Sequence, residues 1–171
     1  MPAVTAIYRS AVLGGTASFE IEPPDEAEML RRFRAIGAGG FAYLVAEVGG
    51  HVVGYAYAQA YRPRPAYRFT VENSIYIAPA MHGRGVGGAL LCALICRCRE
   101  AGFRRMIAVI GDSAQHASIN LHRRSGFTHA GTLHAVGHKF GRWLDVVLME
   151  LPLGEGDGSP PRDPALPQGN I

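Results

Sequence analysis

Residues 74–88 read SIYIAPAMHGRGVGG, and this stretch decides the fold. Residues 75–77 are β-branched or aromatic, and the glycines at 83, 85, 87 and 88 lie just before and at the start of an apolar run over 86–101. This order predicts a strand, a tight turn and a helix. The free N–H groups and the dipole of a helix N-terminus attract anions, and glycines let a phosphate come close to the backbone. We therefore expect a pyrophosphate site here, with Arg84 adding a fixed charge.

Two well-known phosphate-binding turns do not fit this stretch. A P-loop needs Gly-Lys-Ser or Gly-Lys-Thr after its glycines, and the turn has neither. A dinucleotide-binding turn follows the first strand of a parallel series. Here the turn follows the third predicted strand of an apparently antiparallel set. Both alternatives are therefore rejected.

The rest of the chain predicts one mixed α/β domain. Hydrophobic periodicity and glycine stops predict helices over 3–13, 25–37, 86–101 and 114–124, and strands over 41–48, 52–61, 69–77, 106–110, 127–133 and 144–151. We expect an α/β (α+β) fold: a mixed, mostly antiparallel twisted sheet flanked by helices. The domain should span 1–151. The Gly- and Pro-rich segment 152–171 should be a disordered tail.

Composition and charge limit the classes of function. The net charge of +3 does not demand nucleic acid, and no stretch reaches the roughly 20 apolar residues of a membrane span. No basic leader precedes residue 13, so we expect a cytoplasmic protein. Cys92, Cys96 and Cys98 lack a fourth ligand at zinc-like spacing. We expect three reduced, mostly buried thiols and no metal site, with Cys92 and Cys96 on one helix face.

The glycine turn fits the pattern Gln/Arg-x-x-Gly-x-Gly/Ala, with His82 at the first position. This pattern resembles the acetyl-CoA signature of the GNAT superfamily. The segments 46–48, 53–58, 67–77 and 108–111 resemble phosphinothricin N-acetyltransferases, and 139–145 (KFGRWLD) is similar to the group that acetylates methionine sulfoximine and methionine sulfone. The resemblance covers residues 3–151. It implies an acetyl-CoA-dependent N-acetyltransferase that acts on the α-amine of a small amino-acid analogue.

The resemblance also implies which residues hold the cofactor. Backbone groups of the third strand would pair with the pantetheine arm, the glycine turn would bind the pyrophosphate, and a side chain after the fourth strand would contact the cofactor. These residues are Ile75, Tyr76 and Ile77; Gly83, Arg84, Gly85, Val86, Gly87 and Gly88; and Gln115, which stands where relatives usually have Asn.

Glu72, in Thr-Val-Glu, matches the position of the general base, and burial in an apolar strand would raise its pKa usefully. The alternative is an exposed glutamate or an ion pair with Arg68. His122 matches a position where many superfamily members have a tyrosine near the sulfur, so it is a candidate to protonate the leaving thiolate. The competing interpretation is a histidine that packs and bonds locally. Leu144 replaces a histidine of the herbicide-resistance members, which leaves Glu72 alone as base.

We expect the residues just before Glu72 to bind the substrate: Arg68, Phe69 and Thr70. Arg68 can grip a carboxylate bidentately, although a solvent-facing arginine is the alternative. Trp143 should serve core or dimer packing, and the resemblance implies a homodimer. Relatives have a strand before the first helix that this chain lacks, so the first strand is expected to be missing or the true start to lie upstream. Two other functions stay open: a non-catalytic acyl-CoA-binding module, and an acetyltransferase for a different amine or a protein.

Overall fold

The structure is a computed structural model that describes residues 1–161. Its elements follow the predicted order, with two short 3-10 turns (Pro65–Tyr67 and Pro79–Met81) on either side of β3. The helices are α1 (Pro2–Gly14), α2 (Glu26–Ala38), α3 (Val86–Glu100) and α4 (His116–Arg124). The strands are β1 (Tyr43–Val48), β2 (His51–Ala60), β3 (Thr70–Ile77), β4 (Arg105–Gly111), β5 (Thr128–Lys139) and β6 (Arg142–Pro152).

Within the described residues the strands form one six-stranded sheet in the order β1-β2-β3-β4-β6-β5. Each neighbouring pair is antiparallel except β3 and β4, which run parallel. The predicted mixed, mostly antiparallel sheet is therefore confirmed. The parallel pair arises because α3 connects β3 to β4 as a crossover helix.

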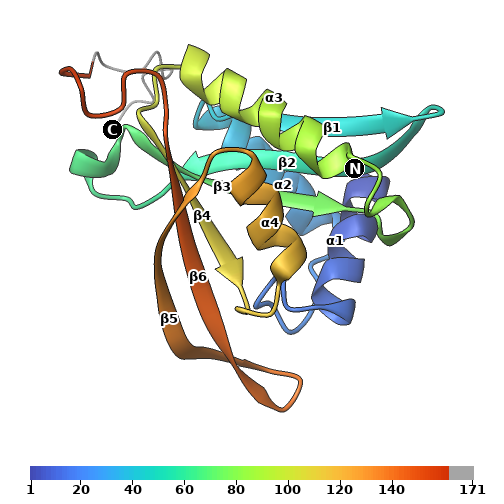
Figure 1. Ribbon diagram of the computed structural model, residues 1–171. Helices are drawn as coiled ribbons and strands as arrows, with labels where there is room; N and C mark the ends of the chain where they lie inside the picture. The colour runs from blue at the N-terminus through green and yellow to red at the C-terminus, as the bar shows by residue number, and fades with distance from the viewer. Residues whose placement is uncertain (162–171) are drawn as a thin grey trace.

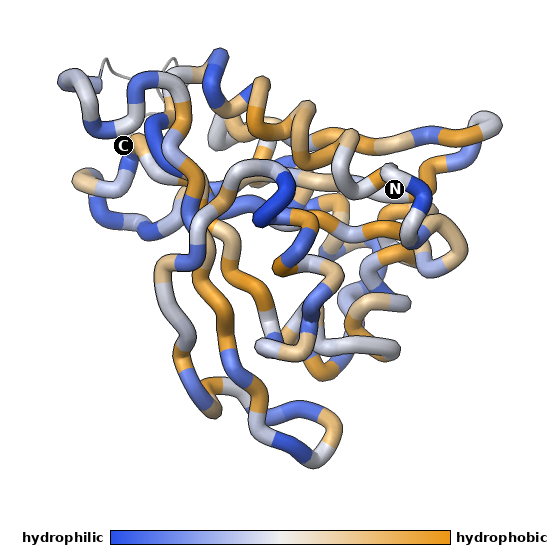
Figure 2. Tube along the Cα trace, in the orientation of Figure 1, coloured by the Kyte–Doolittle hydropathy of each residue, from blue (hydrophilic) through white to orange (hydrophobic). Residues whose placement is uncertain are grey.

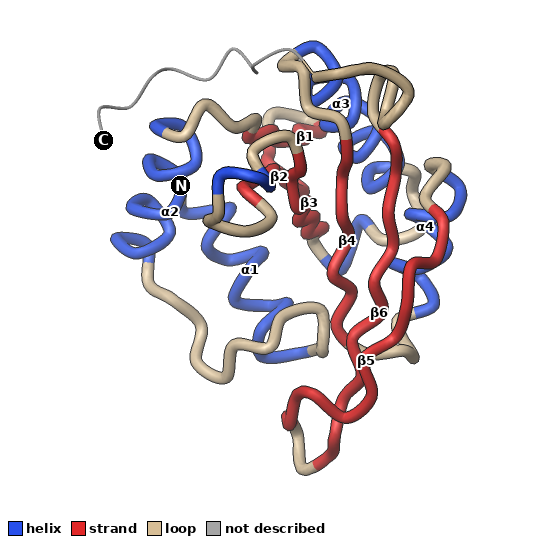
Figure 3. Tube along the Cα trace, turned by 90° about the vertical axis from the view of Figure 1, so that its left-hand side faces the viewer, coloured by secondary structure: helices blue, strands red, loops and turns tan. Residues whose placement is uncertain are grey.

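Helices cover both faces of this sheet. In the turned view, α1 and α2 lie on one side of the strands, and α3 and α4 lie on the other (Figure 3). In Figure 1 the β5–β6 hairpin extends beyond the helices, so its far end projects from the body of the domain.

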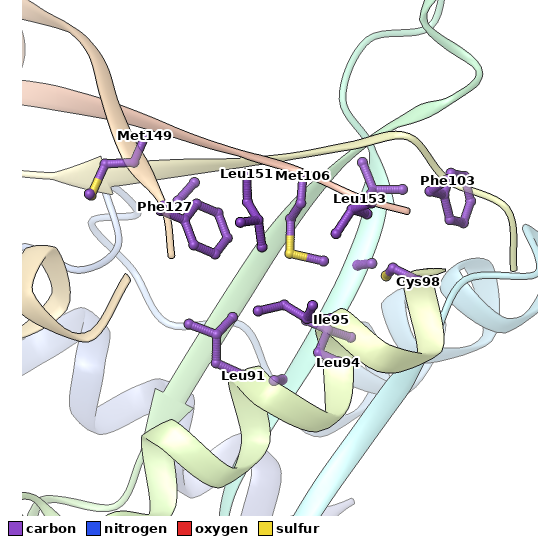
Figure 4. Close-up of a cluster of buried hydrophobic side chains, with 14 of the residues drawn as sticks. Leu91, Leu94, Ile95, Cys98, Phe103, Met106, Phe127, Met149, Leu151 and Leu153 are labelled. Carbon is purple, nitrogen blue, oxygen red and sulfur yellow. The ribbon is translucent and has the colours of Figure 1, made fainter. Parts of the chain in front are cut away.

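The larger core lies between α3 and the strands beneath it. Leu91 and Leu94 of α3 are fully buried and face Met106 of β4 and Leu153 (Figure 4). The hydropathy colouring shows the same hydrophobic run along α3 (Figure 2). Burying a leucine side chain contributes about 1.5–3 kcal/mol. This core therefore holds the turn before α3 at a fixed place relative to the sheet.

The opposite face carries an aromatic core. Val4, Ile7, Tyr8 and Val12 of α1 are buried against it. Tyr43, Tyr55 and Tyr57 of β1 and β2 stack with centroid separations of 5.5–6.3 Å. The alternation of tyrosines and alanines along β2 put the tyrosines on this face and Ala56 and Ala58 on the other, as period-2 geometry requires.

Some expectations about the C-terminal part of the chain need correction. β5 runs to Lys139, six residues beyond the predicted end, because pairing with β6 extends it through a register shift between Leu133 and Gly137. The domain also does not stop at 151, since Leu153 is fully buried and Arg104 bonds Ser159. The rest of the predicted tail, residues 162–171, lies outside the described residues.

One prediction about individual side chains was wrong, and one of the two alternatives for a second side chain is excluded. Cys92 and Cys96 share one face of α3 as expected, but that face is exposed, and only Cys98 is buried. Burial raises the pKa of the Cys98 thiol to about 12. Trp143 is 66% exposed, so it does not belong to the core. The cause is the same in both cases, because the strand and helix periods fix shared faces without fixing which face is covered.

The segment between α1 and α2, residues 15–20, is anchored to the far end of the sheet. Lys139, the chain's only lysine, donates from Nζ to the carbonyl oxygens of Val12, Gly15 and Ser18 at 2.7, 2.9 and 2.8 Å. Its side chain is buried, with 4% of the residue exposed. The three ammonium protons are thus all used.

The same segment is held from a second direction. Thr16 donates to Asp112, which also pairs with Arg142. The ring of Phe19 lies so close to Gly111 and Gly137 that a Cβ at either glycine would be within 2.7 Å of it. Residues 15–20 are therefore a fixed wall at the end of β4.

Candidate active site

The sheet opens between its two parallel strands. β3 and β4 pair only from Thr70 to Asn73 and from Arg105 to Ala108. Beyond this point β3 continues to pair with β2, and β4 continues to pair with β6, so the two strands diverge (Figure 1). Within the described part of the chain, residues 74–77 of β3 therefore present a strand edge that has no partner strand on the side of β4.

A pocket of about 60 Å³ lies in this opening. Residues 73–76 and 108–111 form its two strand walls, α4 contributes Ser118 and His122, and Ala17 and Gln115 complete it. Asn73 and Ala108, the last paired residues, stand where the strands part. An unpaired strand edge beside a pocket suits an extended ligand that adds main-chain hydrogen bonds.

The glycine turn lies at the end of β3, as predicted. His82 bonds the carbonyl oxygen of Ile77 through Nε2 at 3.0 Å, which ties the turn to the strand. Gly83 and Gly85 have φ of 73° and 83°, and Gly85 is the N-cap of α3. Among residues 1–161 no side chain caps this helix, and the space around both glycines is open. The first amides of α3 are therefore available to an anion.

Two glycines of the turn should respond oppositely to alanine. Gly85→Ala places a Cβ in the left-handed region, which costs about 1 kcal/mol. Gly88 lies inside the first turn of α3 with open space around it. Gly88→Ala should instead stabilise the fold by about 0.5–1 kcal/mol because helical glycine is unfavourable. Urea unfolding of both variants checks this, and equal signs for the two changes would contradict the assigned turn geometry.

Glu72 lies on β3 opposite Gln59 of β2 and Ile107 of β4, on the sheet face that α1 and α2 cover. Its side chain is half-buried. Burial raises the pKa of Glu72, and the positive charge of Arg62 partly opposes this. Arg62 is thus a charge that acts on the carboxylate. A carboxyl with a raised pKa suits proton acceptance near neutral pH.

The predicted substrate residues precede Glu72 along the chain. Arg68 is exposed, donates from Nη1 to the carbonyl oxygen of Pro65 at 3.4 Å and places its guanidinium 4.3 Å from the ring centre of Phe69. Thr70 begins β3 and lies on the same face as Glu72, two residues further on. The structure thus brings Thr70 and Glu72 together, and Arg68 lies on the turn that leads into them.

His122 and Glu72 lie on opposite faces of the sheet. Glu72 and Asn73 are consecutive strand residues, so their side chains point to opposite sides. His122 approaches from α4 and bonds Asn73, with Nε2 3.0 Å from the amide nitrogen. Its Nδ1 is 2.8 Å from the carbonyl oxygen of Ser118. A bound ligand can therefore reach both candidate catalytic groups only in the opening between β3 and β4.

His122 is buried, and its burial favours the neutral ring. The carbonyl of Ser118 can only accept, so Nδ1 carries a proton and donates it there. Burial lowers the pKa of His122, and Phe127 packs edge-on at a centroid separation of 5.0 Å. With Nδ1 as the protonated nitrogen, Nε2 accepts from Asn73. Protonation of a leaving thiolate by His122 stays a prediction that the arrangement of its two bonds does not itself favour.

Gln115 lies at the start of α4 and lines the pocket, but its amide is also engaged. Nε2 donates to the hydroxyl of Thr16 at 3.0 Å. It thereby joins the wall formed by residues 15–20.

Sequence reasoning missed Asn73 and the anchoring of residues 15–20. An asparagine inside a β-rich strand is itself a signal, because asparagine is depleted in strands. No comparable local signal marks Thr16 or Lys139, since their partners lie 96 to 127 residues away. Among the described residues, no cluster of His, Cys, Asp or Glu side chains is placed to hold a metal ion.

An anion site at a helix start, beside an unpaired edge in a split sheet, defines a class of protein. The chain belongs to the acetyltransferase (GNAT) family, whose sequence model matches residues 5–127, and it is an N-acetyltransferase. It is 54% identical to the phosphinothricin N-acetyltransferase of Alcaligenes faecalis over 94% of this chain and 82% of that protein.

Two other similar proteins are also named as acetyltransferases of amino-acid analogues. The L-methionine sulfoximine/L-methionine sulfone acetyltransferase of Pseudomonas paraeruginosa is 42% identical over 94% of this chain and 93% of its own length. The crystal structure of a GNAT superfamily phosphinothricin acetyltransferase from Sinorhizobium meliloti, in complex with acetyl-CoA, superposes with a TM-score of 0.90. It has 52% identity and covers 93% of this chain and 86% of that one.

Proposed function

We propose that this protein transfers the acetyl group of acetyl-CoA to the α-amine of a small amino-acid analogue of the methionine sulfoximine, methionine sulfone or phosphinothricin type, with Glu72 as general base. The observation that carries the proposal is the half-buried Glu72 with a raised pKa, next to the point where β3 and β4 part. The named activities of the similar proteins support the substrate class.

The chain's own residues fit acetyl-CoA. The uncapped start of α3, with open space at Gly83 and Gly85, suits the pyrophosphate, and Arg84 is exposed beside it. The unpartnered edge of Ile75–Ile77 suits the pantetheine arm. When bound, the cofactor supplies an acetyl group activated as a thioester. Within this proposal, Gly83–Gly88, Ile75–Ile77 and Gln115 hold it.

The role of Glu72 follows from the amine. An α-amine is largely protonated near neutral pH, and only its free lone pair can form the new amide bond. Glu72 in its ionised form accepts the ammonium proton, directly or through a water molecule. The bond from nitrogen to the acetyl carbon then forms while the bond from carbon to sulfur breaks. The nitrogen loses its second proton in this step, and the departing thiolate takes up a proton and leaves as free CoA. In the proposed site, Arg68, Phe69 and Thr70 orient the substrate.

A panel of amines tests the proposal. Purified protein, acetyl-CoA and a thiol-release reagent are combined with methionine sulfoximine, methionine sulfone, phosphinothricin and a short peptide with a free N-terminus. Release of CoA with one of the three amino-acid analogues is expected. Release with the peptide alone would favour a protein substrate. Binding of CoA without release on any amine would favour the non-catalytic alternative.

Arg62 gives the proposed base a measurable pH signature. Because the base works only when ionised, kcat/KM should rise with pH through the raised pKa of Glu72. Arg62 holds this pKa down, so Arg62→Gln should move the acidic limb of the profile to higher pH. Arg64→Gln, an exposed neighbour in the same loop, serves as the matched control. An acidic limb that moves to lower pH, or does not move in Arg62→Gln, would argue against Glu72 as the titrating group.

We also infer a homodimer in the cytoplasm. The β5–β6 hairpin exposes large apolar side chains, which soluble monomers seldom cluster. These side chains are Leu133, Val136, Phe140 and Trp143. The exposed thiols of Cys92 and Cys96 suit a reducing compartment. No helix within residues 1–161 is long and apolar enough to cross a membrane. Sedimentation of wild-type protein and of Trp143→Ser checks the dimer.

A further inference from the structure

The pocket between β3 and β4 holds a buried polar group whose bonding is incomplete. Asn73 stands at the last paired position of β3, where the strands part, and it lines the pocket. It is 6% exposed. Within the part of the chain that the structure describes, its Oδ1 has no hydrogen-bond partner, and no other buried side-chain atom shares this condition.

The orientation of this carboxamide is fixed from α4. Ser118 accepts from Nδ1 of His122, which leaves a lone pair on Nε2. Nε2 therefore accepts from the amide nitrogen of Asn73 at 3.0 Å. A rotated carboxamide would bring Oδ1 against that lone pair, and two acceptors would face each other. The neutral ring thus selects the orientation in which nitrogen faces His122 and Oδ1 faces away.

An oriented acceptor without a protein partner calls for a donor from a ligand. The strand edge beside it, residues 74–77, suits an extended chain. The pantetheine arm of CoA carries two amide N–H groups and one hydroxyl along such a chain, whereas the acetyl group and the thioester carry no donor. Both amides lie between the hydroxyl and the thioester, so the group that best matches a site at the opening of the sheet is an amide of the arm.

We propose that Asn73 is a positioning residue of the acyl-donor site, whose carboxamide oxygen accepts a hydrogen bond from a pantetheine amide N–H. His122 acts through Asn73, by holding the carboxamide in the receptive orientation. This inference rests on the proposed binding of acetyl-CoA but not on the identity of the amine. It assigns His122 a function that needs no proton transfer.

The test compares two ligands that share one half. CoA contains the pantetheine arm, and 3′-phospho-ADP contains only the part expected at the glycine turn. Asn73→Leu keeps the branched shape and the number of heavy atoms of the side chain and removes both polar atoms. Calorimetry should show CoA binding about tenfold more weakly, as expected for one lost hydrogen bond, with 3′-phospho-ADP binding within twofold of wild type. The matched control is Asn120→Leu on the exposed side of α4, which should change neither affinity.

A second variant separates orientation from contact. His122→Phe keeps Asn73 but removes the ring nitrogen that orients it, so CoA should again bind more weakly while 3′-phospho-ADP does not. Equal weakening of both ligands in Asn73→Leu would overturn the proposal, because general disruption of the fold would explain it. CoA affinity within twofold of wild type would overturn it as well. Neither measurement uses an amine, so failure of the proposed substrate class would be seen separately in the amine panel.

Discussion

Glu72→Gln is expected to lower kcat by about 100- to 10,000-fold, the range that general acid–base catalysis contributes. Glutamine keeps the size and polarity of the side chain but cannot accept a proton from the amine. Because Glu72 lies on the sheet face opposite Asn73 and away from the glycine turn, the affinity for CoA should stay within about twofold. Initial rates at saturating substrates and calorimetry with CoA measure the two quantities.

A matched substitution shows whether this effect belongs to the position. Glu47→Gln removes a carboxylate from an exposed site on β1, far along the sheet from the opening between β3 and β4. Its kcat should equal that of the wild type. If Glu72→Gln kept wild-type turnover at all pH values, another group would have to accept the proton. If it lost CoA binding instead, its role would lie in the cofactor site.

Lys139→Met should have the largest effect on stability. Methionine matches the length of the lysine stem but donates nothing, so the carbonyl oxygens of Val12, Gly15 and Ser18 lose their shared donor in a buried place. Leaving buried acceptors unsatisfied costs about 1–3 kcal/mol per group, and relief from burying an ammonium offsets part of this sum. We expect a loss of about 3 kcal/mol, or roughly 6–12 °C in Tm.

Lys139→Arg provides the control for charge. A planar guanidinium keeps the charge but cannot reproduce the three converging bonds of an ammonium, so partial recovery at best is expected. Thermal and urea unfolding of both variants give the free energies. A loss below about 1 kcal/mol in Lys139→Met would mean that the carbonyls find other partners. Wild-type stability in Lys139→Arg would show that charge alone matters.

Local patterns were enough to place most elements. The strand over 74–77, the glycine turn and α3 were predictable because each has its own periodicity or stop signal, and α1 begins and ends within one residue of its expected limits. β5 beyond Leu133 was not, because Gly137 and the histidines around it break the alternation that marks a strand. Its extension comes from pairing with β6, which is a tertiary effect.

Some parts of the candidate site were likewise predictable from local sequence, and others depend on tertiary contacts. The glycine turn and Glu72 follow from a short segment and a resemblance, whereas the Asn73–His122 bond joins residues 49 positions apart. Sequence placed both Glu72 and His122 in the site but not on opposite faces of the sheet. That arrangement depends on which strand residue α4 meets, and neither strand nor helix periodicity contains this information.

The burial of the only lysine has a chemical consequence for an enzyme that acylates amines. Apart from the α-amino group of Met1, the 171-residue chain carries a single amine, and Nζ of Lys139 is enclosed with all its protons engaged. Every other basic side chain that carries a permanent charge is an arginine, whose guanidinium is a poor nucleophile because it stays protonated. The folded protein thus exposes almost no amine that its own acetyl-CoA could acetylate. Prolonged incubation with acetyl-CoA should leave the folded chain with at most one added acetyl group, on Met1, and unfolding should expose a second site.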